Sequence, residues 1–431
     1  MPGSLSIPWL RRFVFATALV TLALIAVGGL VTSHEAGMAV PDWPNTYGYN
    51  MFLFPISKWM GGILYEHSHR LVASLVGLLT TVMAGWLWVR ETRKGARQAI
   101  TPSASGKAAR SWWLKLSSRL SAACSRNLVS ASGIAVIVAV ILLMGVRKLP
   151  VFIALASLAP VAIAFSLYRL RRQDAGGLRW WGMFAFAAVI LQGVLGGLRV
   201  VLFKDEIGIF HAALAQLFFV LICLIALFTT DWWRNLGPAL AAPSPLSRVF
   251  LATTLLILAQ LVLGATMRHQ HAGLAIPDFP LAYGKIWPAM DNQAILHYNQ
   301  QRVEIVAANP ITAFQISLQM VHRLSALAIV VGVGFCAWAS RRSLGWQNPV
   351  SKLALLWMGL ILAQGVLGAA TIWSNKAADI ATGHVVVGAL CLATGAVVTT
   401  VSRRLAGSRV ASVPVAARMV PLHAQPVENY R

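Results

Sequence analysis

The chain has 431 residues, of which 58% are hydrophobic and only 11% are charged. Soluble domains carry about 25% charged residues, so a chain this apolar is predicted to be an all-α integral membrane protein. Its 36 Lys and Arg against 13 Asp and Glu give a net charge of +23, but the apolar content indicates a lipid partner and excludes nucleic acid.

Apolar runs long enough to cross a bilayer, which takes about 20 residues, recur along the chain. They predict eight core spans, at 13–33, 62–89, 180–200, 209–230, 249–267, 314–338, 353–373 and 382–402. Two further runs, 129–146 and 149–169, predict an extra helical hairpin, for which a pair of re-entrant or surface helices is the alternative.

Lys and Arg are distributed unequally between the two sides of these spans. With the N-terminus inside, the inner segments hold 25 basic and four acidic residues, and the outer segments hold nine basic and eight acidic residues. Because positive charges are retained on the cytoplasmic side, both termini are predicted to be cytoplasmic. Most of the net charge is therefore an orientation signal.

Sequence motifs repeat between the first and last four core spans. Residues 37–48 read GMAVPDWPNTYG and residues 273–284 read GLAIPDFPLAYG, with seven of twelve positions identical. The further matches are His69-Arg70 with His322-Arg323, Gln192–Gly196 with Gln364–Gly368, and His211 with His384. The pattern predicts two tandem four-helix bundles with the same orientation in the membrane.

The repeat also divides the chain. The first bundle comprises 13–90 and 179–235, and the second comprises 246–404. A basic cytoplasmic linker and the extra hairpin, together 91–178, are inserted into the first bundle. Residues 405–431 are predicted to be a disordered cytoplasmic tail.

Four histidines lie at similar depth, each on an even-numbered core span near its outer end: His69, His211, His322 and His384. Ionisable groups inside spans are costly and usually functional, although a single one is often only a helix–helix hydrogen bond. Two repeat-related pairs favour metal binding by neutral imidazole. A pair in each bundle suits axial ligation of a haem iron, whereas zinc needs three or four ligands at one point.

Charged residues adjoin the histidines. Arg70 and Arg323 are predicted to pair with porphyrin propionates, with a position towards the head groups as the alternative. Glu66 lies three residues before His69 and shares its helix face, whereas its counterpart Gln319 cannot transfer a proton. This asymmetry suggests that the first half reacts and the second holds a cofactor; equally, Glu66 could simply pair with Arg70.

The string Glu66-His67-Ser68-His69-Arg70 resembles the E-x-x-H-R motif of haem A synthases. The PDWP stretch at 41–44, the three later histidines and the tandem repeat are also similar to that family, over about 13–403 without 91–178. The resemblance implies oxidation of the C8 methyl group of haem O to a formyl group, which gives haem A for terminal oxidases. It also implies haem B, with its iron, as cofactor.

The resemblance assigns roles to individual residues. His322 and His384 are expected to ligate haem B, His69 and His211 to face the substrate haem, and Glu66 to act in catalysis. The expected location is a bacterial cell membrane or its equivalent. The expected partners are the haem O-producing enzyme and terminal oxidase assembly factors, and homo-oligomerisation stays open.

Two other functions use the same features. A di-haem b-type cytochrome, such as a quinol or ferric reductase, would employ both histidine pairs without altering a haem. A transporter built from parallel repeats would bind no haem at all.

Overall fold

The computed structural model describes residues 6–98, 160–164, 167, 177–236, 244–301 and 310–411. Within these ranges the chain is helical and contains no β-strand. Eight of the described helices are long and apolar enough to cross a membrane: α1 (Ser6–Ser33), α2 (Gly61–Gln98), α5 (Leu178–Leu202), α6 (Asp205–Thr229), α8 (Ser244–His269), α10 (Ala313–Leu344), α11 (Pro349–Trp373) and α12 (Ala378–Ala411). The predicted all-α membrane fold is confirmed.

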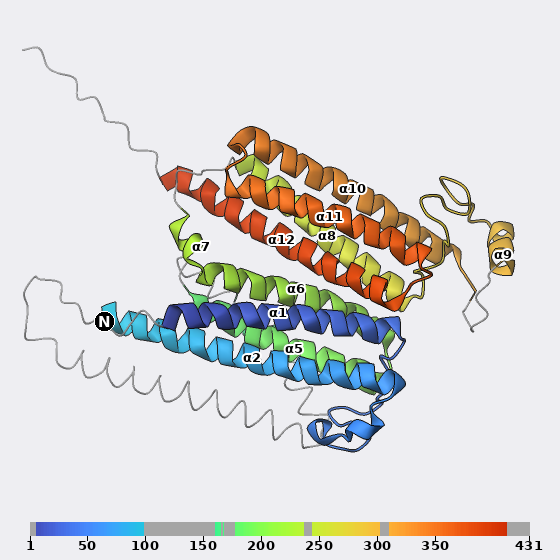
Figure 1. Cartoon of the computed structure of the whole chain (residues 1–431), viewed down its shortest axis with the longest axis horizontal. Coiled ribbons are helices and arrows are strands. Elements are labelled where there is room, and N and C mark those ends of the chain that lie inside the picture. Colours follow the sequence, from blue (N-terminus) through green and yellow to red (C-terminus); the bar gives the residue numbers. More distant parts are fainter. Residues whose placement is uncertain are drawn as a thin grey trace, which may run out of the picture.

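The eight long helices form two four-helix bundles that lie side by side (Figure 1). In the first bundle α1 and α5 each pack against both α2 and α6, so α2 and α6 are diagonal to each other. In the second bundle α8 and α11 each pack against both α10 and α12, which leaves α10 and α12 diagonal. Helices α1 and α6 contact α8 and α12 between the bundles.

Apolar side chains fill each bundle and also cover its outside. Phe250 and Trp357 are fully buried in the second bundle, and Ile222 is fully buried in the first. Outward-facing side chains such as Leu19 and Val366 stay more than 60% exposed. Helices that are apolar on both the inner and outer faces match a lipid surrounding, where close packing holds the bundle together.

The connections α1–α2 (34–60) and α8–α10 (270–301 and 310–312) lie at the same end of the two bundles, called the loop end below (Figure 1). They contain the short helices η1 (Met51–Leu53), η2 (Ile56–Lys58) and α9 (Asn292–Gln300), and α7 (Asp231–Asn235) lies towards the opposite end. At the loop end Glu35 Oε1 lies 3.8 Å from His271 Nδ1, a contact between the two halves.

The eight long helices all begin before their predicted bounds, and two of them extend furthest at their ends. Helix α2 continues to Gln98 and α12 to Ala411, so the first residues of the predicted linker and tail are helical. The predicted hairpin at 129–146 and 149–169 lies outside the described residues, apart from 160–164 and 167, which are helical.

Candidate functional site

The fold places the two histidines of each predicted pair on diagonal helices of one bundle. His69 on α2 faces His211 on α6, and their ring centroids are 6.4 Å apart. In the second bundle His322 on α10 and His384 on α12 lie close enough to interact electrostatically. All four rings are partly buried. The structure therefore brings together both pairs that the repeat predicted.

Each of the four rings lies against a glycine of an adjacent helix. The pairs are Gly28 with His69, Gly196 with His211, Gly264 with His322 and Gly368 with His384, and a Cβ on the glycine would lie 3.1, 3.1, 3.4 and 3.1 Å from the ring Cε1. Any larger residue would displace the imidazole at the three tightest positions. These glycines are therefore seats for the rings, a role that spacing alone did not indicate.

Two glycines of the repeated motif have no such role. A Cβ on Gly193 or Gly365 would meet nothing within 4 Å. They lie on the exposed face of their helices, so only the second glycine of each motif contacts a histidine ring.

The ring nitrogens of the four histidines make few hydrogen bonds to the described part of the chain. Nδ1 is buried without a hydrogen-bond partner among the described residues in all four rings. The nearest glutamine amide nitrogens, of Gln192 and Gln364, are 3.5 and 3.4 Å from Nε2 of His211 and His384. These long contacts weaken the alternative in which the histidines merely link helices.

The geometry of the first pair fits two axial ligands of one metal. With a nitrogen–metal distance of about 2.0–2.1 Å, each imidazole centre lies about 3 Å from the metal, so two opposed rings are about 6 Å apart. The observed 6.4 Å between His69 and His211 matches this separation. Among the described residues no three His, Cys, Asp or Glu side chains gather as a metal site. Pairs of imidazoles therefore fit haem iron better than zinc.

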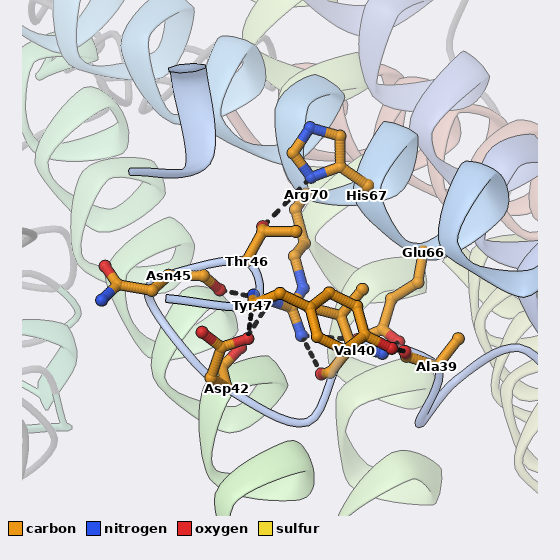
Figure 2. A network of polar contacts seen from close by, with 9 residues as sticks. All are labelled: Ala39, Val40, Asp42, Asn45, Thr46, Tyr47, Glu66, His67 and Arg70. Atoms are coloured by element: carbon orange, nitrogen blue, oxygen red, sulfur yellow. Dashed lines mark hydrogen bonds and ion pairs between the residues drawn. The ribbon is translucent and has the colours of Figure 1, made fainter. Parts of the chain in front are cut away.

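The two PDWP-type stretches form closed loops of identical design, and Figure 2 shows the first of them. In the first, the Asp42 carboxylate accepts hydrogen bonds from the backbone N–H groups of Tyr47 and Gly48, and the Tyr47 hydroxyl donates to Ala39 O. Asp278 and Tyr283 repeat the same three bonds in the second half. The loops are thus rigid scaffolds at the end of each histidine site.

Arg70 is committed to the first of these loops (Figure 2). Its Nη1 donates to Asp42 O at 2.6 Å and Asn45 O at 2.9 Å, and its Nη2 donates to Val40 O at 2.7 Å and Glu66 Oε1 at 2.6 Å. All four terminal N–H groups are occupied, and the side chain is 8% exposed. This departs from the predicted propionate contact, because the loop returns over α2 and places its carbonyls around the guanidinium.

Glu66 and Gln319 hold their loops in the same way. Glu66 Oε2 accepts a hydrogen bond from Val40 N, and Gln319 Oε1 accepts one from Ile276 N, both at 2.7 Å. An uncharged amide is therefore sufficient for this bond. The pairing of Glu66 with Arg70 is present, and the catalytic role of Glu66 stays a prediction.

Arg323 differs from its counterpart in the first half. Its Nη1 and Nη2 donate to Leu281 O and Asp278 O, at 2.8 and 2.7 Å, and its Nε is buried without a partner in the described part of the chain. Gln319 supplies no charge at the position where Glu66 faces Arg70. The second site therefore carries one negative charge fewer than the first.

Three residues at the loop end carry roles that the sequence did not indicate. His67 is fully buried beneath the first loop, with Nδ1 3.1 Å from Thr46 Oγ1 and its ring against Trp59. Arg199, near the end of the predicted span 180–200, and Arg268, one residue beyond the predicted span 249–267, lie inside α5 and α8. Only the repeat alignment could have singled them out, since their counterparts are threonines.

Comparison with known proteins gives consistent results. The model of the COX15-CtaA family, described as cytochrome oxidase assembly protein, matches residues 131–396. A heme A synthase of Hyphomonas neptunium is 24% identical over 375 residues, which cover 84% of this chain and 84% of the relative. A heme A synthase of Shouchella clausii is 37% identical over 82 residues, 19% of this chain and 26% of the relative.

Proposed function

The chain belongs to the cytochrome oxidase assembly protein family, and from this membership we propose that it is a haem A synthase. It is a membrane-bound enzyme. The reaction that we assign to it is oxidation of the C8 methyl group of haem O to a formyl group. The observation that carries the proposal is the pair of imidazoles on diagonal helices in each bundle, each ring seated on a glycine.

The two halves have different tasks in this proposal. His322 and His384 hold haem B, which supplies a redox-active iron when bound. His69 and His211 hold the substrate haem in the first bundle. Both loops need only a hydrogen-bond acceptor at this position, and Gln319 supplies it as well as Glu66 does. The loop therefore does not require the negative charge of Glu66, which supports a reactive role for the first half.

Residues around the first histidine pair would act in three ways. The glycine seats fix the imidazole planes, and the closed loop held by Arg70 limits the access of water to the loop end. With water as the oxygen donor, conversion of a methyl to a formyl group releases four protons and passes four electrons to an external acceptor, and Glu66 is the carboxylate nearest in sequence to His69. We assign proton acceptance to Glu66, which the loop bonds hold one helical turn from that histidine.

The proposal places the reaction in the outer half of the membrane, with both termini cytoplasmic. Arg323 remains the candidate for a haem B propionate, whereas Arg70 is assigned to the loop. The partners that follow are the enzyme that makes haem O and the factors that assemble terminal oxidases.

Haem analysis of the purified protein tests the function. The chain is expressed with a source of haem O, and extracted haems are separated by chromatography. We expect a resident haem B and accumulation of haem A. Recovery of unmodified haem O, with haem B bound and a suitable reductant present, would favour a di-haem cytochrome. A protein without any Soret absorption would favour a transporter.

A further inference from the structure

One face of α5 lines the first histidine site. Gln192 Nε2 donates to His211 O at 2.9 Å, and Gly196 seats the His211 ring. Arg199 follows at the next turn of the same face, about 5 Å closer to the loop end. The wall of the site therefore ends in a guanidinium group.

The surroundings of Arg199 are shaped to admit it. A Cβ on Gly37 of the first loop would lie 2.7 and 2.8 Å from its Nη2 and Nη1. Gly208 of α6 makes room for the His269 ring first, since a Cβ there would lie 2.7 Å from His269 Nε2, and Arg199 Nε follows at 3.1 Å. Gly208 is one turn before His211. Arg199 also interacts electrostatically with both His69 and His211. The cation thus lies at the mouth of the pair, between the loop and α6.

A charge inside a membrane span is costly and usually functional. The plain alternative is a side chain that extends to the head groups. Gly37, which leaves room for the guanidinium beside the first loop, and the position of the guanidinium next to the histidine pair argue against it. Thr371, the counterpart of Arg199, carries no charge and donates its hydroxyl to Leu367 O of its own helix. The bundle can therefore form without a cation here.

The second half carries a cation at a different helix. Arg268 lies one turn beyond Gly264, the seat of His322, and its Nη2 donates to Gly29 O and Ser33 Oγ of α1. Its counterpart in the first half is Thr32, which bonds its own helix. Each half therefore has its own cation near the histidine pair. In the first half this cation lies on the third long helix, α5, and in the second half it lies on the first long helix, α8.

We propose that Arg199 binds a propionate of the substrate haem and so sets the rotation of the porphyrin in its plane. This inference rests on the proposed function. His69 and His211 would hold the iron but would leave the ring free to turn about the line through them. Both propionates lie on one edge of haem O, so a guanidinium–carboxylate contact at that edge decides where each methyl group lies. Arg70 cannot take this part because its terminal N–H groups are occupied.

The test compares an acid with its ester. The purified full chain is titrated with haem O and with haem O dimethyl ester, in which both propionates are neutral, and binding is followed by the Soret band. The proteins are wild type, Arg199→Gln, Arg199→Lys and the control Lys204→Gln, which removes an exposed cation from the same end. Absorption of the resident haem and the elution volume establish that each variant is folded.

Wild type is expected to bind the acid about ten- to a hundredfold more tightly than the ester, the range for hydrogen bonds to charged groups. Arg199→Gln should weaken acid binding by that factor and leave ester binding unchanged. Arg199→Lys should keep part of the preference, and Lys204→Gln should behave as wild type.

Two results would overturn the inference alone: equal weakening of acid and ester by Arg199→Gln, or a wild type without any preference for the acid. A wild type that binds neither form would instead overturn the proposed function.

Discussion

The substitution Glu66→Gln separates the charge of this side chain from its shape. Gln319 already makes the equivalent bond to Ile276 N at 2.7 Å, so the variant should keep its bond to Val40 N. What it removes is the carboxylate that lies 2.6 Å from Arg70 Nη2, in a pair whose side chains are only 5% and 8% exposed.

The structural cost of this change should be modest. Breaking a buried ion pair costs about 3–5 kcal/mol when a charge is left without partners. Arg70 keeps three backbone carbonyl acceptors, so we expect about 2 kcal/mol, the range for one hydrogen bond to a charged group. Thermal unfolding of the purified variant, followed by the resident haem absorption, measures this loss.

The effect on conversion should be much larger. If Glu66 accepts a proton, its loss should lower the rate of haem A formation about 10²–10⁴-fold, while resident haem B stays bound. The assay is the ratio of haem A to haem O in extracts of the purified protein. The mirror variant Gln319→Glu is the control and should convert at the wild-type rate. Wild-type conversion by Glu66→Gln would refute the proton-accepting role, and loss of resident haem would refute the division between the halves.

Two further predictions concern the second site. His322→Ala and His384→Ala should each remove most of the resident haem, whereas His69→Ala should retain it, as measured by the Soret band per protein; equal losses in all three would contradict the division of tasks. Gly368→Val should weaken binding of the resident haem about five- to 150-fold, because its Cβ would lie 3.1 Å from the His384 ring and overpacking costs about 1–3 kcal/mol, whereas Gly365→Val, which meets nothing within 4 Å, should leave haem binding unchanged.

The spans and the histidine pairs were predictable because they depend on local patterns. Long apolar runs identify membrane helices, and the repeat shows which histidines are equivalent. Four-helix topology then brings His69 to His211, since the second and fourth helices of each unit are diagonal.

Contacts that depend on the path of a loop were not predictable. An arginine follows the histidine in both halves, which suggested that it binds a porphyrin propionate. The fold of residues 37–48 instead decides the partners of Arg70. Likewise, Gly193 and Gly196 look equivalent in sequence, and only the rotation of α5 shows that one of them faces His211. Arg199 was not singled out because it lies next to the last residue of the predicted span 180–200, and helix ends are the least certain part of a span prediction.

The contact between Glu35 and His271 has a consequence for the origin of the chain. The two positions are equivalent in the repeat, and both residues adopt the same left-handed backbone conformation, with φ of 54° and 51°. Equivalent positions that meet must lie on the two-fold axis that relates the halves. In a dimer of two separate, identical units each such residue would face its own copy, and two glutamates would repel each other. When the two units are joined in one chain, the two equivalent positions at the axis can hold different residues, here a glutamate and a histidine. For the same reason one half can carry Glu66 and Arg199 while the other carries Gln319 and Thr371.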